Sequence, residues 1–158
     1  MKRLLLILSL TIALNIHAQE QSNYMSNNEI QAFLDTLVAN KEELKGKTME
    51  YFYLMFELTK LPLRHFSYDV TSPWIDPEGI SYLTSVLLFT EKLSDMDAGK
   101  EYFEIKLVLD IPQINAHEYF KPLPHGTYEI WWNAFKQRTM TMPVKDIIYY
   151  RVILPLHF

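Results

Sequence analysis

Hydrophobic residues recur at helical spacing soon after the N-terminal segment of the chain. Ser26 and Glu29 form the Ser-x-x-Glu pattern of a capping box, in which each residue can satisfy a free backbone N–H of the other. The apolar positions that follow are Ile30, Phe33, Leu34, Leu37 and Val38. Steps of three and four residues place side chains on one face of a helix. The pattern therefore predicts an amphipathic helix that begins after Ser26.

A second helix is predicted after a polar connection. Gly46 is a candidate turn residue, and Thr48 is placed to cap a helix whose apolar residues again recur at helical spacing. Those residues are Met49, Phe52, Tyr53 and Phe56. Pro62 ends this helix or marks the start of the next element, because proline is excluded from helix interiors. A short connection between two helices favours an antiparallel helical hairpin.

Beyond Pro62 the pattern changes to the two-residue period of β-strands. Residues 64–70 alternate, residues 80–91 are rich in β-branched and aromatic side chains, and residues 102–109 alternate most regularly. The last of these places Phe103 and its alternate neighbours on one face. The segments 80–91 and 102–109 are predicted to pair as an antiparallel hairpin. A strongly β-prone run, residues 144–156, is predicted as a central or well-covered last strand.

The tandem tryptophans in "GTYEIWWNAF" fit two structures. As a strand they would contribute to an aromatic platform that could stack on a ligand. As a helix capped by Thr127, the segment places Tyr128, Trp131, Trp132 and Phe135 on one face. The helix accounts for more of the residues, so we predict a third helix whose tryptophans anchor it to the sheet. The fold class is then α+β, with an N-terminal helical hairpin, an antiparallel sheet of about four strands, and a third helix before the last strand.

The N-terminus has the layout of a secretory signal peptide. Lys2 and Arg3 precede an apolar run that ends at Leu14, and a short polar stretch leads to Ala18. We expect residues 1–18 to be removed by cleavage after Ala18, residues 19–25 to form a flexible lead-in, and residues 26–158 to form a single globular domain. The apolar run is shorter than the roughly 20 residues that a membrane span needs. The chain has no cysteine, so disulfides and a lipid-modified cysteine are excluded.

Charge excludes two classes of partner. Removing the signal peptide takes away two of the 15 basic residues and none of the 19 acidic ones, which leaves a net charge of −6. Nucleic-acid binding depends on lysine and arginine neutralising phosphates, and anionic membrane surfaces attract basic segments. An acidic chain without a basic run suits neither. We therefore expect no nucleic-acid partner and no membrane span after cleavage, and the sequence leaves the oligomeric state open.

Familiar catalytic motifs are incomplete in this chain. The tripeptide GKT at residues 46–48 lacks the first glycine of a P-loop, because Lys41 stands in its place. Residues 79–83 lack the second glycine of a serine-hydrolase elbow, since Leu83 stands there. His117 is followed four residues later by Lys121 and not by the second histidine of a zincin helix. We therefore assign no catalytic residue, no metal ligand and no cofactor.

Two stretches remain as candidate ligand-binding residues. The loop "SPWIDPEG" contains Trp74, which could stack on a ligand, together with Asp76 and Glu78. The proline-rich stretch 112–126 contains His117 and His125. Each residue also has an ordinary structural role available, as a cover for the core or as a loop histidine.

Three functional hypotheses follow. The first is a non-catalytic binding or interaction module of a bacterial-type cell envelope, exported to the periplasm or secreted, with an envelope protein or a glycan as partner. The second is a small hydrolase of cell-wall or polysaccharide material, which would use paired carboxylates such as Asp76 and Glu78. The third is a metal-dependent version in which His117 and His125 converge. The absence of a complete catalytic motif favours the first.

Overall fold

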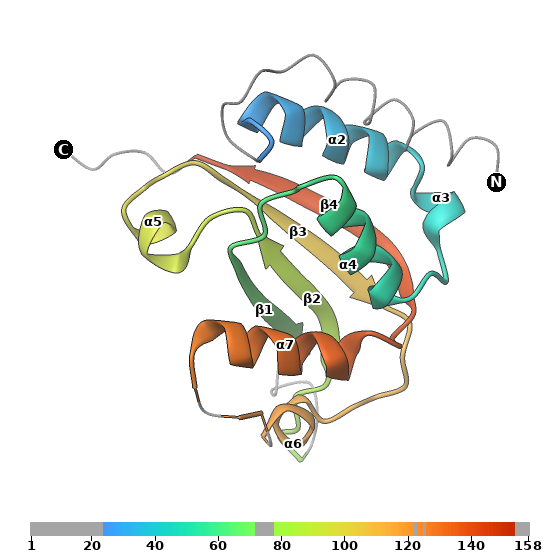
Figure 1. Ribbon diagram of the computed structural model, residues 1–158. Helices are drawn as coiled ribbons and strands as arrows, with labels where there is room; N and C mark the ends of the chain where they lie inside the picture. Colours follow the sequence, from blue (N-terminus) through green and yellow to red (C-terminus); the bar gives the residue numbers. More distant parts are fainter. Residues whose placement is uncertain (1–23, 72–77, 122, 125, 154–158) are drawn as a thin grey trace.

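The computed structural model describes residues 24–71, 78–121, 123–124 and 126–153 of the chain. Its elements in chain order are α2 (Asn27–Ala39), α3 (Lys41–Leu44), α4 (Met49–Leu58), β1 (His65–Val70), β2 (Leu83–Phe89), α5 (Leu93–Asp97), β3 (Tyr102–Leu109), α6 (Ala116–Phe120), α7 (Tyr128–Thr139) and β4 (Val144–Val152). The four strands form one antiparallel sheet in the order β1-β2-β3-β4 (Figure 1). The predicted α+β fold is confirmed: N-terminal helices precede a four-stranded antiparallel sheet, and a helix precedes its last strand.

The N-terminal helices begin where their capping residues predict. The carboxylate of Glu29 accepts hydrogen bonds from the backbone N–H and the hydroxyl of Ser26, both at 2.7 Å, and these bonds lower the pKa of Glu29. Thr48 precedes α4 as predicted, and the polar connection between the two helices contains the short helix α3. Phe33 of α2 meets Phe56 of α4 edge to face, with ring centroids 6.3 Å apart. The two helices therefore pack on each other.

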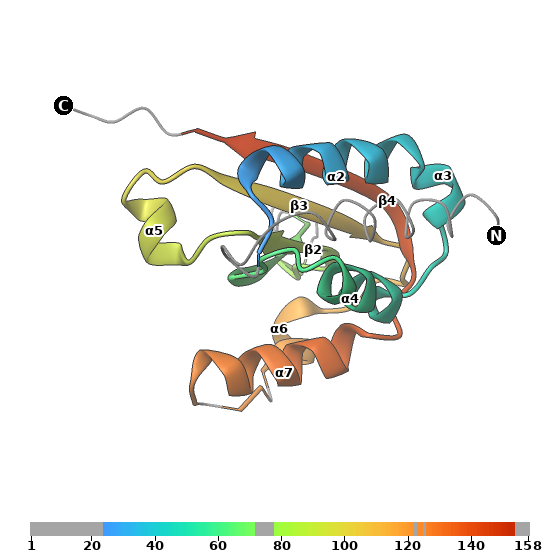
Figure 2. The same cartoon turned by 45° about the horizontal axis from the view of Figure 1, so that its top comes forward.

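The core lies on one face of the sheet. Strand β3 alternates strictly between buried and half-buried positions, and its buried side chains are Phe103, Ile105, Leu107 and Leu109. The buried faces of α2 and α4 belong to the same hydrophobic cluster as these residues. Figures 1 and 2 show α4 and α7 on the same side of the sheet. Period-two alternation in the sequence thus marks a sheet with one covered face.

Helix α7 is confirmed, and Phe66 of β1 is the side chain on which it rests. The Phe66 ring lies 4.8 Å from Trp131, 4.6 Å from Trp132 and 4.4 Å from Phe135, measured between ring centroids. The tryptophans differ in burial, because Trp131 remains 37% exposed whereas Trp132 packs against the core and also meets Tyr53 of α4. The sequence predicts both tryptophans as anchors; Trp132 has that role, whereas Trp131 is a partly exposed cover over Phe66.

The second face of the sheet is more polar and lies outside the core. On β3 it presents Tyr102, Glu104, Lys106 and Val108, which are all half-buried. Lys106 Nζ reaches diagonally across β2 to Asp69 Oδ2 of β1 at 2.6 Å. Burial raises the pKa of Glu104, and the neighbouring Asp69 adds to this effect while Lys106 opposes it.

The last strand, predicted to be central or well covered, is an edge strand, so the central position is wrong. The N-terminal helices compensate by packing against it. Tyr149 donates a hydrogen bond to the carboxylate of Asp35 and accepts one from the side-chain amide of Gln31, both on α2. Lys41 of α3 pairs with Asp146 of β4 at 2.9 Å. Helices α2 and α3 therefore pack against β4, which has one neighbouring strand in the described sheet.

The other differences from the sequence prediction are local. Strand β2 is shorter than the predicted segment 80–91, and the chain reversal after it contains α5. The stretch 112–126, which the sequence left unassigned, contains α6, begun by Asn115 whose side chain accepts a hydrogen bond from the Glu118 N–H at 3.2 Å. In the described part of the chain, none of the helices combines the length and the apolar character required to cross a membrane.

Candidate functional site

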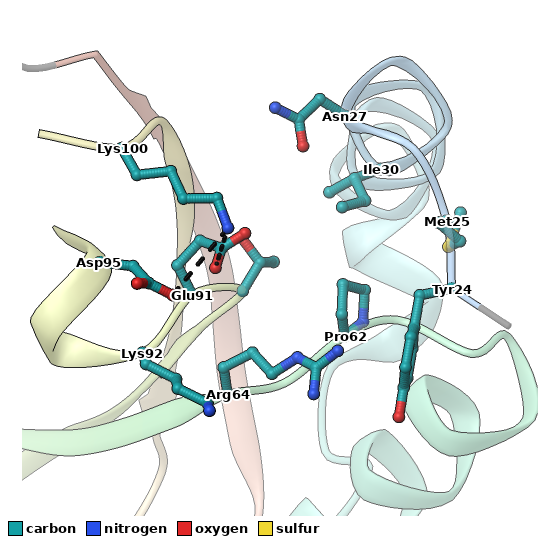
Figure 3. Close-up of a pocket in the computed structure, with 11 residues that line it drawn as sticks. Tyr24, Met25, Asn27, Ile30, Pro62, Arg64, Glu91, Lys92, Asp95 and Lys100 are labelled. Atoms are coloured by element: carbon teal, nitrogen blue, oxygen red, sulfur yellow. Dashed lines mark ion pairs between the residues drawn. The ribbon is translucent and has the colours of Figure 1, made fainter. Parts of the chain in front are cut away.

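A pocket of about 350 Å³ opens where three parts of the chain meet (Figure 3). One wall is the start of α2 with the residues before it, the second is the segment that enters β1, and the third is the connection between β2 and β3. The described residues that line the pocket are Tyr24, Met25, Asn27, Ile30, Pro62, Arg64, Thr90, Glu91, Lys92, Asp95 and Lys100. These residues come from distant parts of the sequence, so they form a pocket only in the folded chain.

Arg64 is held in place by the sheet and by an aromatic ring. Its backbone N–H donates to the carbonyl of Phe89 at 2.8 Å, which extends the pairing of β1 and β2 by one residue. Its guanidinium carbon lies 4.3 Å from the centroid of the Tyr24 ring, a cation–π contact. Pro62, two residues earlier, restricts the backbone of this segment. These contacts position the guanidinium group, and neither of them neutralises its positive charge.

The connection between β2 and β3 contributes both carboxylates of the pocket together with two lysines. Lys100 Nζ lies 2.8 Å from Glu91 Oε2 and 3.9 Å from Asp95 Oδ2, so one ammonium group joins both carboxylates. The hydrogen bond from Lys100 to Glu91 raises the pKa of Lys100, while the charge of Arg64 nearby opposes that shift. The Thr90 side chain has a structural role, since its hydroxyl accepts a hydrogen bond from the Phe103 N–H at 2.9 Å.

Two of the three cations in the pocket have no ion-pair partner among the described residues. These are Arg64 and Lys92, whereas Lys100 is engaged by Glu91 and Asp95. Three positive charges against two negative charges leave the lining one charge positive, in a protein whose net charge is negative. A guanidinium with free N–H groups beside an aromatic ring is a typical receptor for an anionic group. The arrangement therefore suits the binding of a ligand with an anionic group.

Of the five residues predicted from sequence, only Glu78 and His117 are described, and neither lines this pocket. Trp74, Asp76 and His125 fall outside the described residues, so the separation of the Asp76 and Glu78 carboxylates is not defined. Glu78 precedes β2, and His117 lies in the first turn of α6.

The two predicted stretches are nevertheless neighbours. The Leu83 N–H donates to the Ile114 carbonyl at 2.9 Å, and the Ala116 N–H donates to the Ser81 carbonyl at 3.0 Å. The chain that follows Glu78 therefore pairs with the chain that precedes His117. Among the described residues, no group of three or more His, Cys, Asp or Glu side chains could hold a metal ion.

The pocket was missed in the sequence because its residues carry no shared motif. Arg64 stands at the start of an alternating strand pattern, and residues 91–100 read as a charged chain reversal. One local signal exists: Arg64 directly follows "LPL" and is the only arginine between Arg3 and Arg138. That signal does not specify which carboxylates or rings will lie around it.

Comparisons with known families and proteins do not assign this pocket. No family model matches the chain, and neither the curated proteins nor the solved structures contain a match. The geometry of the pocket and the properties of the sequence are therefore what support a function.

Proposed function

We propose that the protein is a non-catalytic binding module of the cell envelope, exported to the periplasm or secreted, which holds part of an envelope glycan or protein in the pocket around Arg64. The observation that carries this proposal is the free guanidinium of Arg64. It makes a cation–π contact with Tyr24 and has no ion-pair partner among the described residues. The predicted signal peptide, residues 1–18, supports the location.

The chemistry of the lining supports binding over catalysis. Paired carboxylates in a hydrolase need one group that holds a proton and one that is ionised. Glu91 and Asp95 instead both lie close to the ammonium group of Lys100, at 2.8 Å and 3.9 Å. The hydroxyl of Thr90 is buried and occupied by Phe103. These contacts hold the lining groups in place, which suits a binding pocket.

The proposal is tested by capture experiments with matched variants. Mature protein is immobilised and screened against a glycan array and against a detergent extract of cell envelopes. Arg64→Gln removes the free charge and Tyr24→Ala removes the ring beside it, while Lys145→Gln removes one charge on β4, away from this pocket. A partner captured by the wild-type protein and by K145Q, but lost with R64Q and Y24A, supports the proposal. Capture that survives both pocket substitutions places the binding elsewhere and contradicts it.

The location is tested separately. Cells that express the full chain are fractionated, and the N-terminus of the recovered protein is sequenced. We expect the protein in the periplasm or the medium, beginning at Gln19. Retention in the cytoplasm with Met1 intact contradicts an exported role.

A further inference from the structure

We propose that the pocket around Arg64 selects a ligand with a singly charged carboxylate and disfavours doubly charged groups such as phosphate monoesters. This inference rests on the proposed binding function and specifies the chemistry of the ligand. Arg64 supplies the recognition, Lys92 supplies additional positive charge, and Glu91 with Asp95 limits the negative charge that the pocket accepts.

The shape of the Arg64 side chain favours a planar anion. A guanidinium presents parallel N–H groups that match the two oxygens of a carboxylate. The Tyr24 ring lies on one side of the guanidinium group, 4.3 Å from its carbon to the ring centroid, and helps to hold it in the pocket. Figure 3 shows the guanidinium beside Pro62, with Tyr24 on one side of it and Asn27 across the pocket. Ile30 and Pro62 provide an apolar surface for the part of the ligand next to its carboxylate.

The net charge of the lining favours a ligand with one negative charge over a ligand with two. The lining has three cations and two carboxylates, so one negative charge neutralises it. A phosphate monoester carries a charge of about −1.5 to −2 at pH 7 and would exceed that balance. Its second negative charge would also lie near Glu91 and Asp95, whose single shared cation is Lys100. Repulsion between like charges in the same pocket would weaken the binding of such a ligand.

Three small probes that differ in charge test this inference directly. Propionate carries one negative charge, propionamide has nearly the same shape without charge, and methyl phosphate is close to doubly charged at pH 8 because the second pKa of such monoesters is about 6. Binding to the mature protein is measured by amide chemical shifts in NMR at constant ionic strength. We expect saturable shifts centred on Arg64 and Glu91, with affinity in the order propionate, methyl phosphate, propionamide.

The variants give the expected size of each effect. Arg64→Gln weakens propionate binding by at least about tenfold, since hydrogen bonds to charged groups are the strong ones. Arg64→Lys keeps the charge but loses the paired N–H groups, so it restores binding only in part. Asp95→Asn removes one limiting charge and strengthens methyl phosphate more than propionate. Lys145→Gln is the matched control and leaves all three probes unchanged.

The outcomes separate the inference from the proposed function. If methyl phosphate binds more tightly than propionate, or if propionamide binds as well as propionate, the carboxylate selection is wrong. If no probe shifts the pocket signals, it is also wrong. The proposed function survives either result when an envelope partner is still captured and still lost with Tyr24→Ala. It fails when capture itself does not depend on the pocket.

Discussion

Replacing Phe66 with alanine tests the packing of α7 on the sheet. Phe66 is 1% exposed, and its ring lies within 4.4–5.7 Å of four aromatic rings of α7. Truncating a fully buried phenylalanine costs about 3–5 kcal/mol. The many aromatic neighbours place Phe66 in the upper part of that range, because each such pair adds about 0.5–1.5 kcal/mol beyond buried area. We expect a loss of about 4–5 kcal/mol, a large part of the roughly 5–15 kcal/mol available to a domain.

The assay is urea denaturation followed by far-UV circular dichroism, with two comparison variants. Trp131 is 37% exposed, so Trp131→Ala is expected to cost about 2–3 kcal/mol, less than truncation of a fully buried aromatic side chain. Leu58 is 71% exposed, so Leu58→Ala is expected to cost under about 0.5 kcal/mol. These variants place the Phe66 result on a scale of burial within the same protein.

A double-mutant cycle between Phe66 and Trp132 isolates their contact. Their ring centroids are 4.6 Å apart, so we expect a coupling free energy of about 0.5–1.5 kcal/mol. The reasoning is refuted if Phe66→Ala costs no more than Leu58→Ala, or if the coupling is zero. Either result would mean that α7 does not depend on Phe66 for its position.

Four further predictions concern stability. Ser26→Ala removes a helix cap and is expected to cost about 1 kcal/mol by urea denaturation. Because the pKa of Glu29 is lower in the folded protein than in the unfolded chain, its contribution is present above about pH 4.3 and is lost at lower pH, and Glu29→Gln should flatten that dependence. Burial lowers the pKa of His65, so stability should fall as the pH drops below about 6.5, and His65→Phe should remove this loss, as thermal melts at several pH values would show. Tyr53→Phe removes the hydrogen bond to Thr139 Oγ1 (2.8 Å) and is expected to cost about 0.5–1.5 kcal/mol, whereas an unchanged urea midpoint would contradict a net contribution from this bond.

Local patterns predicted the helices and strands because each pattern reflects burial on one face. The capping residues Ser26 and Thr48 stand next to the starts of α2 and α4, and the alternation of residues 102–109 coincides with β3. Neither signal needs information from distant residues. The edge position of β4 was not predictable in the same way. An apolar strand can be covered by a helix or by neighbouring strands, and β4 contacts α2 but has only one neighbouring strand in the described sheet.

The candidate pocket depends on distant residues and was not predictable. Tyr24 and Arg64 are separated by 40 positions, and their contact exists because α2, α4 and β1 pack in one particular order. The tandem tryptophans also differ in their exposed fraction, and the helical period of the sequence does not predict that difference. Both lie on the predicted face of α7, but Trp131 is nearer the rim of the core than Trp132.

The one-sided sheet has a consequence for how this protein can change during evolution. In β3, Phe103, Ile105 and Leu107 contact the core, whereas Glu104 and Lys106 face away from it. A saturation scan of this strand should therefore show tolerance that rises and falls with every second residue. The permissive positions form a patch on which new specificities can arise while the fold stays intact, so related chains should diverge most on that face.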